Sequence, residues 1–269
     1  MKKLLLVLGI LAFVATGCEK SSEVVVKKSA IDTIVTAKKL RVCTDPGYEP
    51  FEMRNKNNDI IGFDIDLARE IADEMGVDLE IVPVAFDGII PALITGKCEI
   101  VLAGMTVSAE RNLQVNFPQP YLLIGQTVLL NKKLEGIVTS YEDLNDEKYL
   151  IAGRLGVTGS FVAQEKMPRA ELKLFEAENE AVLEVVNGRA DAFVYDFPLC
   201  ASYAADYPED LVFLSEPFTF EPLGMAIRKG DVDFINWIDN FLAQIKGDGR
   251  FDEMYDYWFN SNEWKKAVR

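Results

Sequence analysis

Residues 99–111 read Glu-Ile-Val-Leu-Ala-Gly-Met-Thr-Val-Ser-Ala-Glu-Arg. The apolar run before Gly104 predicts a buried strand, and the polar residues after it can begin a helix. A glycine at the carboxyl end of a strand, the hydroxyls of Thr106 and Ser108, free helix amides and the guanidinium of Arg111 together suit a carboxylate. The alternative is that Ser108 caps a helix and Arg111 is a solvated surface charge.

Strands and helices alternate around this stretch. In chain order, we predict a strand over 39–44, a helix over 64–75, a strand over 79–84, a helix from 87 through 93 and a strand over 99–103. We expect Asp87 to cap its helix. Helices that connect apolar strands in this order favour a parallel sheet.

The alternation then restarts. The predicted elements are a strand over 149–152, a helix over 159–166, a strand over 172–175, a helix over 180–186, a strand over 192–195 and a helix over 198–205. A second α/β unit means a second lobe. Extended apolar runs lie over 121–130 and 218–226, and helices over 231–245 and 251–259 follow them. The first of these helices carries a stripe expected to be core: Phe234, Trp237, Ile238, Phe241, Leu242 and Ile245.

Five further segments stand in a defined order around residues 104–111. They are Thr44-Asp-Pro-Gly-Tyr-Glu-Pro-Phe-Glu52, Gly62-Phe-Asp-Ile-Asp-Leu-Ala68, Pro83-Val-Ala-Phe-Asp-Gly-Ile-Ile-Pro-Ala-Leu93, Gly156-Val-Thr-Gly-Ser160 and Ala190-Asp-Ala-Phe-Val-Tyr-Asp196. In this order and spacing, the chain resembles the family-3 extracellular solute-binding proteins, which are polar amino-acid-binding proteins of ABC importers. The resemblance covers roughly residues 40–259.

The resemblance implies an α/β, two-lobed periplasmic-binding-protein fold, with a mostly parallel sheet flanked by helices in each lobe. Chains of this family cross twice between the lobes, and the lobes close on the ligand. We therefore expect residues 37–123 and 225–269 in lobe 1 and residues 124–224 in lobe 2. The hinges are expected near 123–126 and 221–224.

The resemblance also assigns residues to an α-amino acid zwitterion. Arg111 would bind its carboxylate with two prongs, helped by the amides of Thr106 and Gly159. Asp196 would bind its ammonium group, together with the carbonyl of Gly104 and the Thr106 hydroxyl. Local sequence alone offers an alternative for Asp196, which is to cap the helix that follows it.

Further residues would surround the ligand's side chain. Tyr48 and Phe86 match the aromatic pair of the family, although aromatic residues in loops can also be local plugs. Asp45 matches the position that reaches a polar or cationic end, but it can also organise the turn after it. Ala103-Gly104, without hydroxyls, resembles a glutamine-type pocket and favours a neutral ligand, whereas Asp45 favours a basic one. Thr158 from the second lobe completes the set.

The composition excludes several other functions. Among 269 residues, 28 basic and 43 acidic side chains give a net charge of −15, which argues against nucleic acid and anionic membrane surfaces as partners of the folded body. The absence of histidine rules out Ser-His-Asp and Cys-His catalysis and histidine-dependent zinc sites. Residues 153–160 are glycine-rich but lack the lysine and the spacing of a P-loop. We expect no catalytic residue, cofactor or metal.

The N-terminus has the pattern of an export signal. Two lysines precede an apolar run over 4–14 that is too short to span a bilayer, so residues 1–17 are expected to be a signal peptide. Ala15-Thr-Gly-Cys18 resembles a lipobox, which implies lipidation of Cys18 with acyl chains such as palmitate. Residues 18–36 would then be a lipidated tether. A plain signal peptide is the alternative.

Three cysteines remain in the body of the chain, Cys43, Cys98 and Cys200, and three thiols cannot all pair. Cys43 lies toward the end of one predicted strand and Cys98 at the beginning of another. A bridge between neighbouring parallel strands would therefore be several residues out of register. We expect all three to be small buried residues.

The hypothesis is a monomer that binds a polar or basic α-amino acid in the cell envelope, outside the cytoplasmic membrane, and delivers it to an ABC permease. Two other classes are considered. One is an enzyme on the same scaffold, such as an acid-catalysed dehydratase resembling cyclohexadienyl dehydratase. The other is a ligand-sensing component of a receptor.

Overall fold

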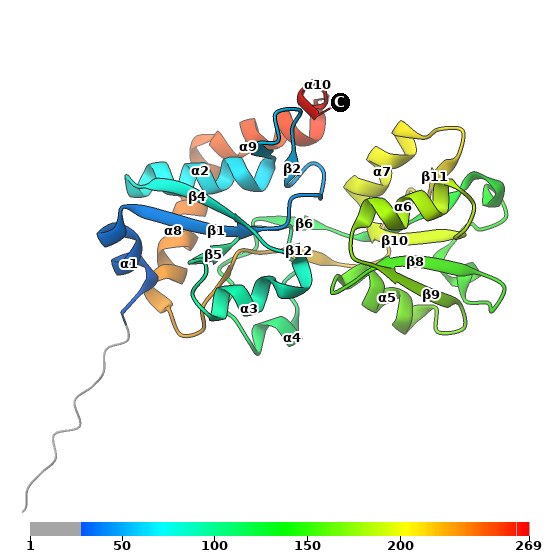
Figure 1. Cartoon of the computed structure of the whole chain (residues 1–269), viewed down its shortest axis with the longest axis horizontal. Coiled ribbons are helices and arrows are strands. Elements are labelled where there is room, and N and C mark those ends of the chain that lie inside the picture. Colours follow the sequence, from blue (N-terminus) through cyan, green and yellow to red (C-terminus); the bar gives the residue numbers. More distant parts are fainter. Residues whose placement is uncertain (1–27, 262, 269) are drawn as a thin grey trace, which may run out of the picture.

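Two β-sheets organise the chain, one in each of two lobes (Figure 1). The structure is a computed structural model that describes residues 28–261 and 263–268. The sheets follow one another along the long axis of the molecule, and helices flank both (Figure 1). The predicted two-lobed α/β fold is therefore confirmed.

The first lobe is built on four strands in the order β13-β5-β1-β4. These strands are β1 (Lys39–Thr44), β4 (Asp78–Pro83), β5 (Ile100–Val101) and β13 (Ala226–Ile227). Strand β1 pairs in parallel with both β4 and β5, so that Val42 lies opposite Ile81 on one side and Ile100 on the other. Strand β13 joins the sheet antiparallel to β5.

Helices and short elements complete the first lobe. The helices are α1 (Ala30–Ala37), α2 (Phe63–Met75), α3 (Ile89–Ile94), α4 (Ala109–Asn112), α8 (Val232–Asp248), α9 (Arg250–Tyr255) and α10 (Lys265–Val268). The short elements are the hairpin of β2 (Met53–Arg54) and β3 (Ile60–Ile61), the 3₁₀ turn η1 (Phe86–Gly88) and the π-helical turn η4 (Asp256–Asn260).

The second lobe contains five strands in the order β11-β7-β10-β8-β9. The strands are β7 (Gln126–Asn131), β8 (Leu150–Arg154), β9 (Glu171–Phe175), β10 (Ala192–Asp196) and β11 (Leu211–Phe213). Strand β8 pairs in parallel with β9 and β10, whereas β7 is antiparallel to β10 and β11. The other elements are helices α5 (Thr158–Lys166), α6 (Glu178–Val186) and α7 (Phe197–Asp206) and turns η2 (Lys132–Leu134) and η3 (Tyr141–Leu144).

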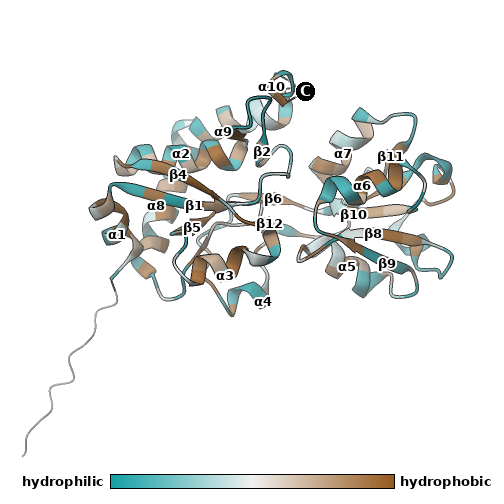
Figure 2. Cartoon of the chain, in the orientation of Figure 1, coloured by the Kyte–Doolittle hydropathy of each residue, from teal (hydrophilic) through white to brown (hydrophobic). Residues whose placement is uncertain are grey.

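Helix formation follows the apolar periodicity of the sequence. Helix α2 buries Ile65, Ala68 and Ile71, and Figure 2 shows both hydrophobic and hydrophilic colours along it. Its C-cap is Gly76, whose left-handed backbone (φ 65°) suits a residue without a side chain. Five residues of the stripe predicted as core in α8 are at most 4% exposed: Phe234, Ile238, Phe241, Leu242 and Ile245. The sixth, Trp237, is partly buried and packs against that core.

Two antiparallel strands lie between the sheets. They are β6 (Leu122–Ile124) and β12 (Glu221–Leu223), and they pair with each other. Each leads directly into an antiparallel strand of a sheet, β6 into β7 and β12 into β13. The segments predicted as hinges therefore include a paired ribbon, and their role as hinges stays a prediction.

Two predictions for the first lobe are wrong. The tether predicted over residues 18–36 ends earlier, because α1 begins at Ala30 with Ser29 as its N-cap and buries Ile34 completely. Asp87 does not cap α3, because it lies inside η1 and Gly88 takes the N-cap position without a side-chain bond. The predicted signal peptide and Cys18 lie outside the described residues.

No helix within residues 28–261 and 263–268 combines the length and the apolar character needed to cross a membrane.

A disulfide joins Cys43 to Cys98, so the prediction that both are free is wrong. Strand β5 is only two residues long, and Cys98 lies before it, outside the ladder. The chain folds back there after α3, where the Lys97 amide donates to the Ala92 carbonyl over 2.9 Å. This brings the two Cα atoms to 5.7 Å, within the range for a disulfide. Cys200 is a buried free thiol, as predicted.

Replacing Cys43 and Cys98 together by serine should lower the free energy of unfolding by about 2–4 kcal/mol, because the disulfide restricts the unfolded chain. The bridged residues are 55 positions apart. Urea unfolding followed by circular dichroism measures the loss. A reducing agent should destabilise the natural protein and leave the double variant unchanged. In the chain from residue 28 onward, denatured without a reducing agent, a thiol reagent should react with Cys200 alone. Reaction with three thiols would contradict the bridge.

Candidate functional site

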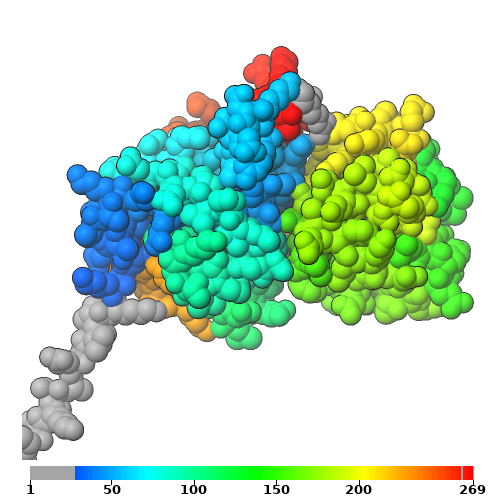
Figure 3. All heavy atoms as spheres, viewed as in Figure 1, coloured from blue at the N-terminus to red at the C-terminus, as the bar shows by residue number. Residues whose placement is uncertain are grey.

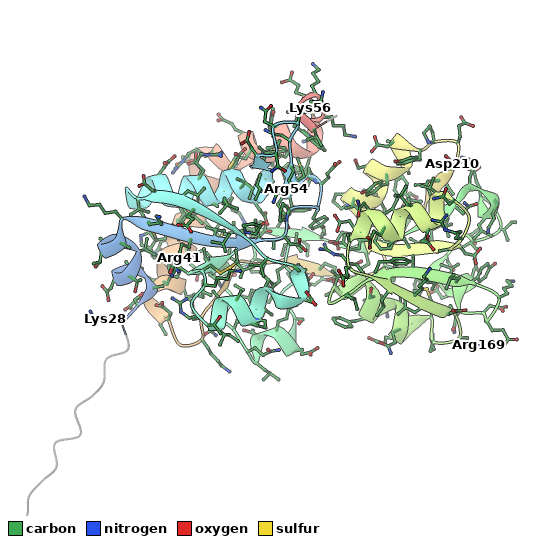
Figure 4. All side chains as sticks on the ribbon, in the orientation of Figure 1. Lys28, Arg41, Arg54, Lys56, Arg169 and Asp210 are labelled. Carbon is green, nitrogen blue, oxygen red and sulfur yellow. A yellow bond between two sulfur atoms is a disulfide. The ribbon has the colours of Figure 1, made fainter. Side chains whose placement is uncertain are left out.

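A cavity lies between the lobes, at the carboxyl ends of β1, β5, β8 and β10. Figure 3 shows atoms of the two lobes in contact, and Figure 4 shows side chains from both meeting there. The lining includes nine of the residues predicted to bind the ligand: Tyr48, Phe86, Ala103, Gly104, Thr106, Arg111, Thr158, Gly159 and Asp196. It also includes five residues that sequence reasoning missed: Glu52, Gln126, Arg154, Val157 and Tyr195.

Side chains from both lobes fill most of this space. The remaining cavity volume is about 10 Å³, which is room for one water molecule. The hydroxyl of Tyr48 in the first lobe donates to Asp196 in the second, and the hydroxyls of Thr106 and Thr158 are 3.3 Å apart across the same boundary. A larger molecule therefore fits only when these side chains, or the lobes, move.

Arg111 is held on the first lobe by a short helix. Ser108 is the N-cap of α4, and its hydroxyl accepts from the Arg111 amide over 3.2 Å. The guanidinium donates to the Thr106 carbonyl (2.8 Å) and, across the boundary, to the Gly156 carbonyl (3.0 Å). Ser108 is thus a cap as the alternative holds, but Arg111 is only 8% exposed and is not a solvated surface charge.

The charge on Arg111 has no carboxylate partner within the described residues. Burial lowers the pKa of its guanidinium, although Glu221 and Asp196 oppose that shift. A buried cation is costly unless an anion pairs with it. Because carbonyl oxygens occupy only part of its five N–H donors, the guanidinium retains the capacity to bind an anion in the cavity.

Asp196 provides the opposite charge from the second lobe. It ends β10 and is the N-cap of α7, yet its side chain makes no capping bond. Its carboxylate instead accepts from the Tyr48 hydroxyl and the Gln126 amide group. The helix-cap alternative is therefore wrong. Burial raises the pKa of Asp196 to about 7, while the Tyr48 hydrogen bond opposes that shift.

Two glycines allow the backbone to form the cavity wall. Gly104 has a left-handed backbone (φ 52°), and a side chain there would collide with the ring of Tyr48. The Gly104 amide donates to Asp64 over 2.8 Å, which fixes the peptide. Gly159 lies in the first turn of α5, where a side chain would collide with the Val194 carbonyl. Amides in this first helical turn are available to an anion.

Asp45 does not line the cavity, in contrast to the other predicted residues. Its carboxylate pairs with Arg154 of the second lobe and accepts from the Phe86 amide over 3.0 Å. Arg154 also pairs with Glu178 over 2.8 Å. Asp45 therefore holds Phe86 and Arg154 outside the cavity lining, and its contact with the end of a ligand stays a prediction.

Tyr48 and Phe86, the predicted aromatic pair, both line the cavity. The Tyr48 ring packs on Phe51 at 4.6 Å between ring centroids. Phe86 lies near two cations, with its ring centroid 5.3 Å from the guanidinium carbon of Arg111 and 5.8 Å from that of Arg154. Their contact with a ligand stays a prediction.

Glu52 is the most informative of the residues that sequence reasoning missed. It is 1% exposed, and neither of its carboxyl oxygens has a hydrogen-bond partner in the described structure. Burial and the nearby Asp64 raise its pKa well above the usual range for glutamate. Its only signal in the sequence is its place at the end of the segment that begins with Thr44.

Residues 40–261 match the family model of the bacterial extracellular solute-binding proteins, family 3. The chain is 30% identical over 233 residues to the putative ABC transporter arginine-binding protein 2 of Escherichia coli (strain K12), which covers 83% of this chain and 91% of the relative. It is 30% identical over 261 residues to the ABC transporter glutamine-binding protein of Bacillus subtilis (strain 168), and 94% of each chain is covered.

Solved structures resemble it as well. A putative binding component of an ABC transporter from Wolinella succinogenes DSM 1740, complexed with lysine, is 48% identical with a TM-score of 0.83, and 85% of this chain and 99% of that chain are covered. An ancestral amino acid-binding protein, a precursor of cyclohexadienyl dehydratase, is 47% identical with a TM-score of 0.82, and 86% of this chain and 100% of that chain are covered. This chain belongs to family 3 of the bacterial extracellular solute-binding proteins.

Proposed function

We propose that the protein closes its lobes on one polar or basic α-amino acid and delivers it to the permease of an ABC transporter. The observation that carries the proposal is that Arg111 and Asp196, of opposite charge and from opposite lobes, line one cavity. Related proteins support it, because they are named for arginine, histidine and glutamine, and one similar structure contains lysine.

In this proposal, each end of the zwitterion has its own partners. The carboxylate takes N–H groups of Arg111 and the first-turn amides of α5, including that of Gly159. The ammonium group takes Asp196 and the carbonyl of Gly104. The ammonium thereby replaces the Tyr48 hydroxyl as the donor to Asp196, and an ion pair takes the place of a hydrogen bond from a neutral donor.

Opening and closing would use the paired ribbon of β6 and β12. We assign residues 30–123, which include α1, and residues 225–269 to lobe 1, and residues 124–224 to lobe 2, with hinges near 123–126 and 221–224. Only these two crossovers connect the sheets within the described chain. Rotation about a few residues at element ends is the usual form of such a hinge.

An enzyme on this scaffold is the second candidate, and Glu52 is the observation that favours it. A buried carboxyl group kept neutral can act as a general acid, as an acid-catalysed dehydratase requires. The similar ancestral protein is itself described as a precursor of cyclohexadienyl dehydratase. The zwitterion-binding arrangement favours binding without conversion.

Family membership and the disulfide support a place outside the cytoplasm, where disulfides persist. The protein would act there as a monomer, anchored by lipid on Cys18 after removal of residues 1–17.

Arg111→Ala and Asp196→Asn should each weaken binding about 30-fold to several thousand-fold, because each leaves one charge of the ligand buried without its partner. Calorimetry with ligand analogues separates the two roles. A ligand analogue whose carboxylate is amidated should bind the natural protein much more weakly than the ligand does, but should bind Arg111→Ala only slightly more weakly. An analogue without the amino group should likewise lose affinity for the natural protein and little for Asp196→Asn.

Arg111→Lys serves as the matched control and should recover only part of the affinity, because an ammonium lacks the planar fork of a guanidinium. The role given to Arg111 is wrong if Arg111→Ala discriminates against the amidated analogue as strongly as the natural protein does. The role given to Asp196 is wrong if Asp196→Asn discriminates as strongly against the des-amino analogue.

The ligand should reduce the radius of gyration in small-angle scattering without changing the circular dichroism spectrum, because closure moves intact lobes.

A thermal-shift screen of amino acids identifies the ligand, since a ligand present at 100 times its dissociation constant adds about 2.7 kcal/mol to the free energy of unfolding. No response to any amino acid would refute the proposed function. Conversion of the ligand, measured by mass spectrometry, would instead establish the enzyme.

Cys18→Ala should release the protein from membrane fractions and leave its ligand affinity unchanged, because the anchor and the cavity are separate parts of the chain. Fractionation followed by calorimetry checks both expectations. A variant that remains in the membrane would show that Cys18 is not the anchor.

A further inference from the structure

Glu52 is a cavity residue that the roles of Arg111 and Asp196 leave unexplained. Both of its carboxyl oxygens are buried without a hydrogen-bond partner among the described residues, although the residue lines the cavity. A buried carboxyl group in this position has given up its hydrogen bonds with water and has gained none from the protein. A ligand that brings a hydrogen-bond donor or a cation into the cavity would supply the missing partner.

The backbone holds Glu52 in a defined place. Its amide donates to the Tyr48 carbonyl over 2.9 Å. Its own carbonyl accepts from the amides of Gly47 (3.0 Å) and Tyr48 (2.8 Å). These bonds close the loop directly before β2, so the Glu52 side chain starts from a fixed turn beside a predicted ligand contact.

Each of the other carboxyl groups near Glu52 already has at least one partner. Arg154 pairs with both Asp45 and Glu178. Asp64 accepts from the Gly104 amide over 2.8 Å and from the Tyr121 hydroxyl over 3.0 Å. The only cation acting on Glu52 is thus shared by two other carboxylates, and Glu52 has no ion pair in the described part of the chain.

Glu52 and Arg111 have different charged neighbours. The charged groups that act most strongly on Glu52 are Asp64, Asp45, Glu178 and Arg154. The carboxylates that act on Arg111 are a different set: Glu221, Asp196 and Glu110. The Phe86 ring is near both Arg111 and Arg154, so a side chain that extends from Arg111 past Phe86 approaches the Glu52 end of the cavity.

We propose that Glu52 binds the cationic end of the ligand's side chain, which makes the ligand a basic amino acid of the lysine or arginine type. The inference rests on the proposed function and narrows it to one chemical class. It also moves the role that the family resemblance gives to Asp45 onto Glu52, because Arg154 already occupies Asp45.

Binding of such a ligand should release a proton. Burial, Asp64, Asp45 and Glu178 raise the pKa of Glu52, and Arg154 opposes them; Tyr48 and Tyr121 are neutral neighbours on the same side. A cationic ligand favours the ionised form of Glu52, which the unliganded protein must first form by losing a proton. Affinity for a basic ligand therefore rises with pH until Glu52 is already ionised in the unliganded protein. Burial raises the pKa of Asp196 to about 7. Because Asp196 is proposed to bind the ammonium group that all α-amino acids share, comparison of two ligands separates its contribution from that of Glu52.

The test compares L-lysine with L-norleucine, which has no ammonium on its side chain, on the purified protein. Glu52→Gln should weaken lysine binding about 30-fold to several thousand-fold and change norleucine binding by less than about threefold. The amide keeps the shape of the carboxyl group, and thermal unfolding confirms folding. Glu209→Gln, which removes an exposed charge, is the matched control and should change neither.

Asp45→Asn tests the competing assignment. It should not alter the ratio of lysine to norleucine affinity, because its carboxylate acts on Arg154 and Phe86. If this variant abolishes the preference for lysine and Glu52→Gln preserves it, the proposal is overturned.

Calorimetry in buffers of different ionisation enthalpy counts the protons released on binding. Lysine should release more protons than norleucine from the natural protein, and this difference should be absent from Glu52→Gln. Equal release by both proteins overturns the proposal. If the protein binds other amino acids but not basic ones, this inference alone is overturned. If it binds no amino acid, the proposed function is overturned.

Discussion

Charged and polar groups are buried together where the two lobes touch. Arg154 of the second lobe pairs with Asp45 of the first, and Tyr48 of the first lobe donates to Asp196 of the second. Buried ions are tolerated only with close partners, because they have given up their hydration. These groups therefore satisfy one another in the closed arrangement and return to water when the lobes separate, so closure and charge pairing are parts of a single equilibrium.

Ligand binding adds to an interface that already holds several hydrogen bonds. In the proposed binding mode, the ammonium group displaces the Tyr48 hydroxyl from Asp196, and the carboxylate shares Arg111 with the carbonyls of Thr106 and Gly156. Affinity therefore depends on how far the new bonds to the ligand outweigh the bonds within the protein that they replace. A ligand that also meets an unpartnered group forms a bond there without breaking another, which gives Glu52 more influence on selectivity than the already paired Asp45.

Local sequence patterns were sufficient for the order of the elements, because strand ends and helix starts are local features. The family resemblance, and not local pattern, predicted that Arg111 and Asp196 lie at one cavity. Local patterns failed where distant segments meet. The pairing of Asp45 with Arg154 spans 109 positions. The Cys43–Cys98 bridge was missed because a strand of two residues was extrapolated into a longer ladder. Burial of Glu52 has no local signature.

The buried carboxylate of Asp64 bonds both to the cavity wall at Gly104 and to the residue before the first crossover, Tyr121. Asp64 accepts from the Gly104 amide and from the hydroxyl of Tyr121, the residue directly before β6, and the Tyr121 amide donates to Leu223 in β12 over 2.9 Å. Gly104 is thereby tied to the first-lobe end of both crossovers. In the proposed hinge motion, the second lobe would move beyond this point, so that the groups that hold Gly104 and Arg111 would travel as one body and Asp196 with the other.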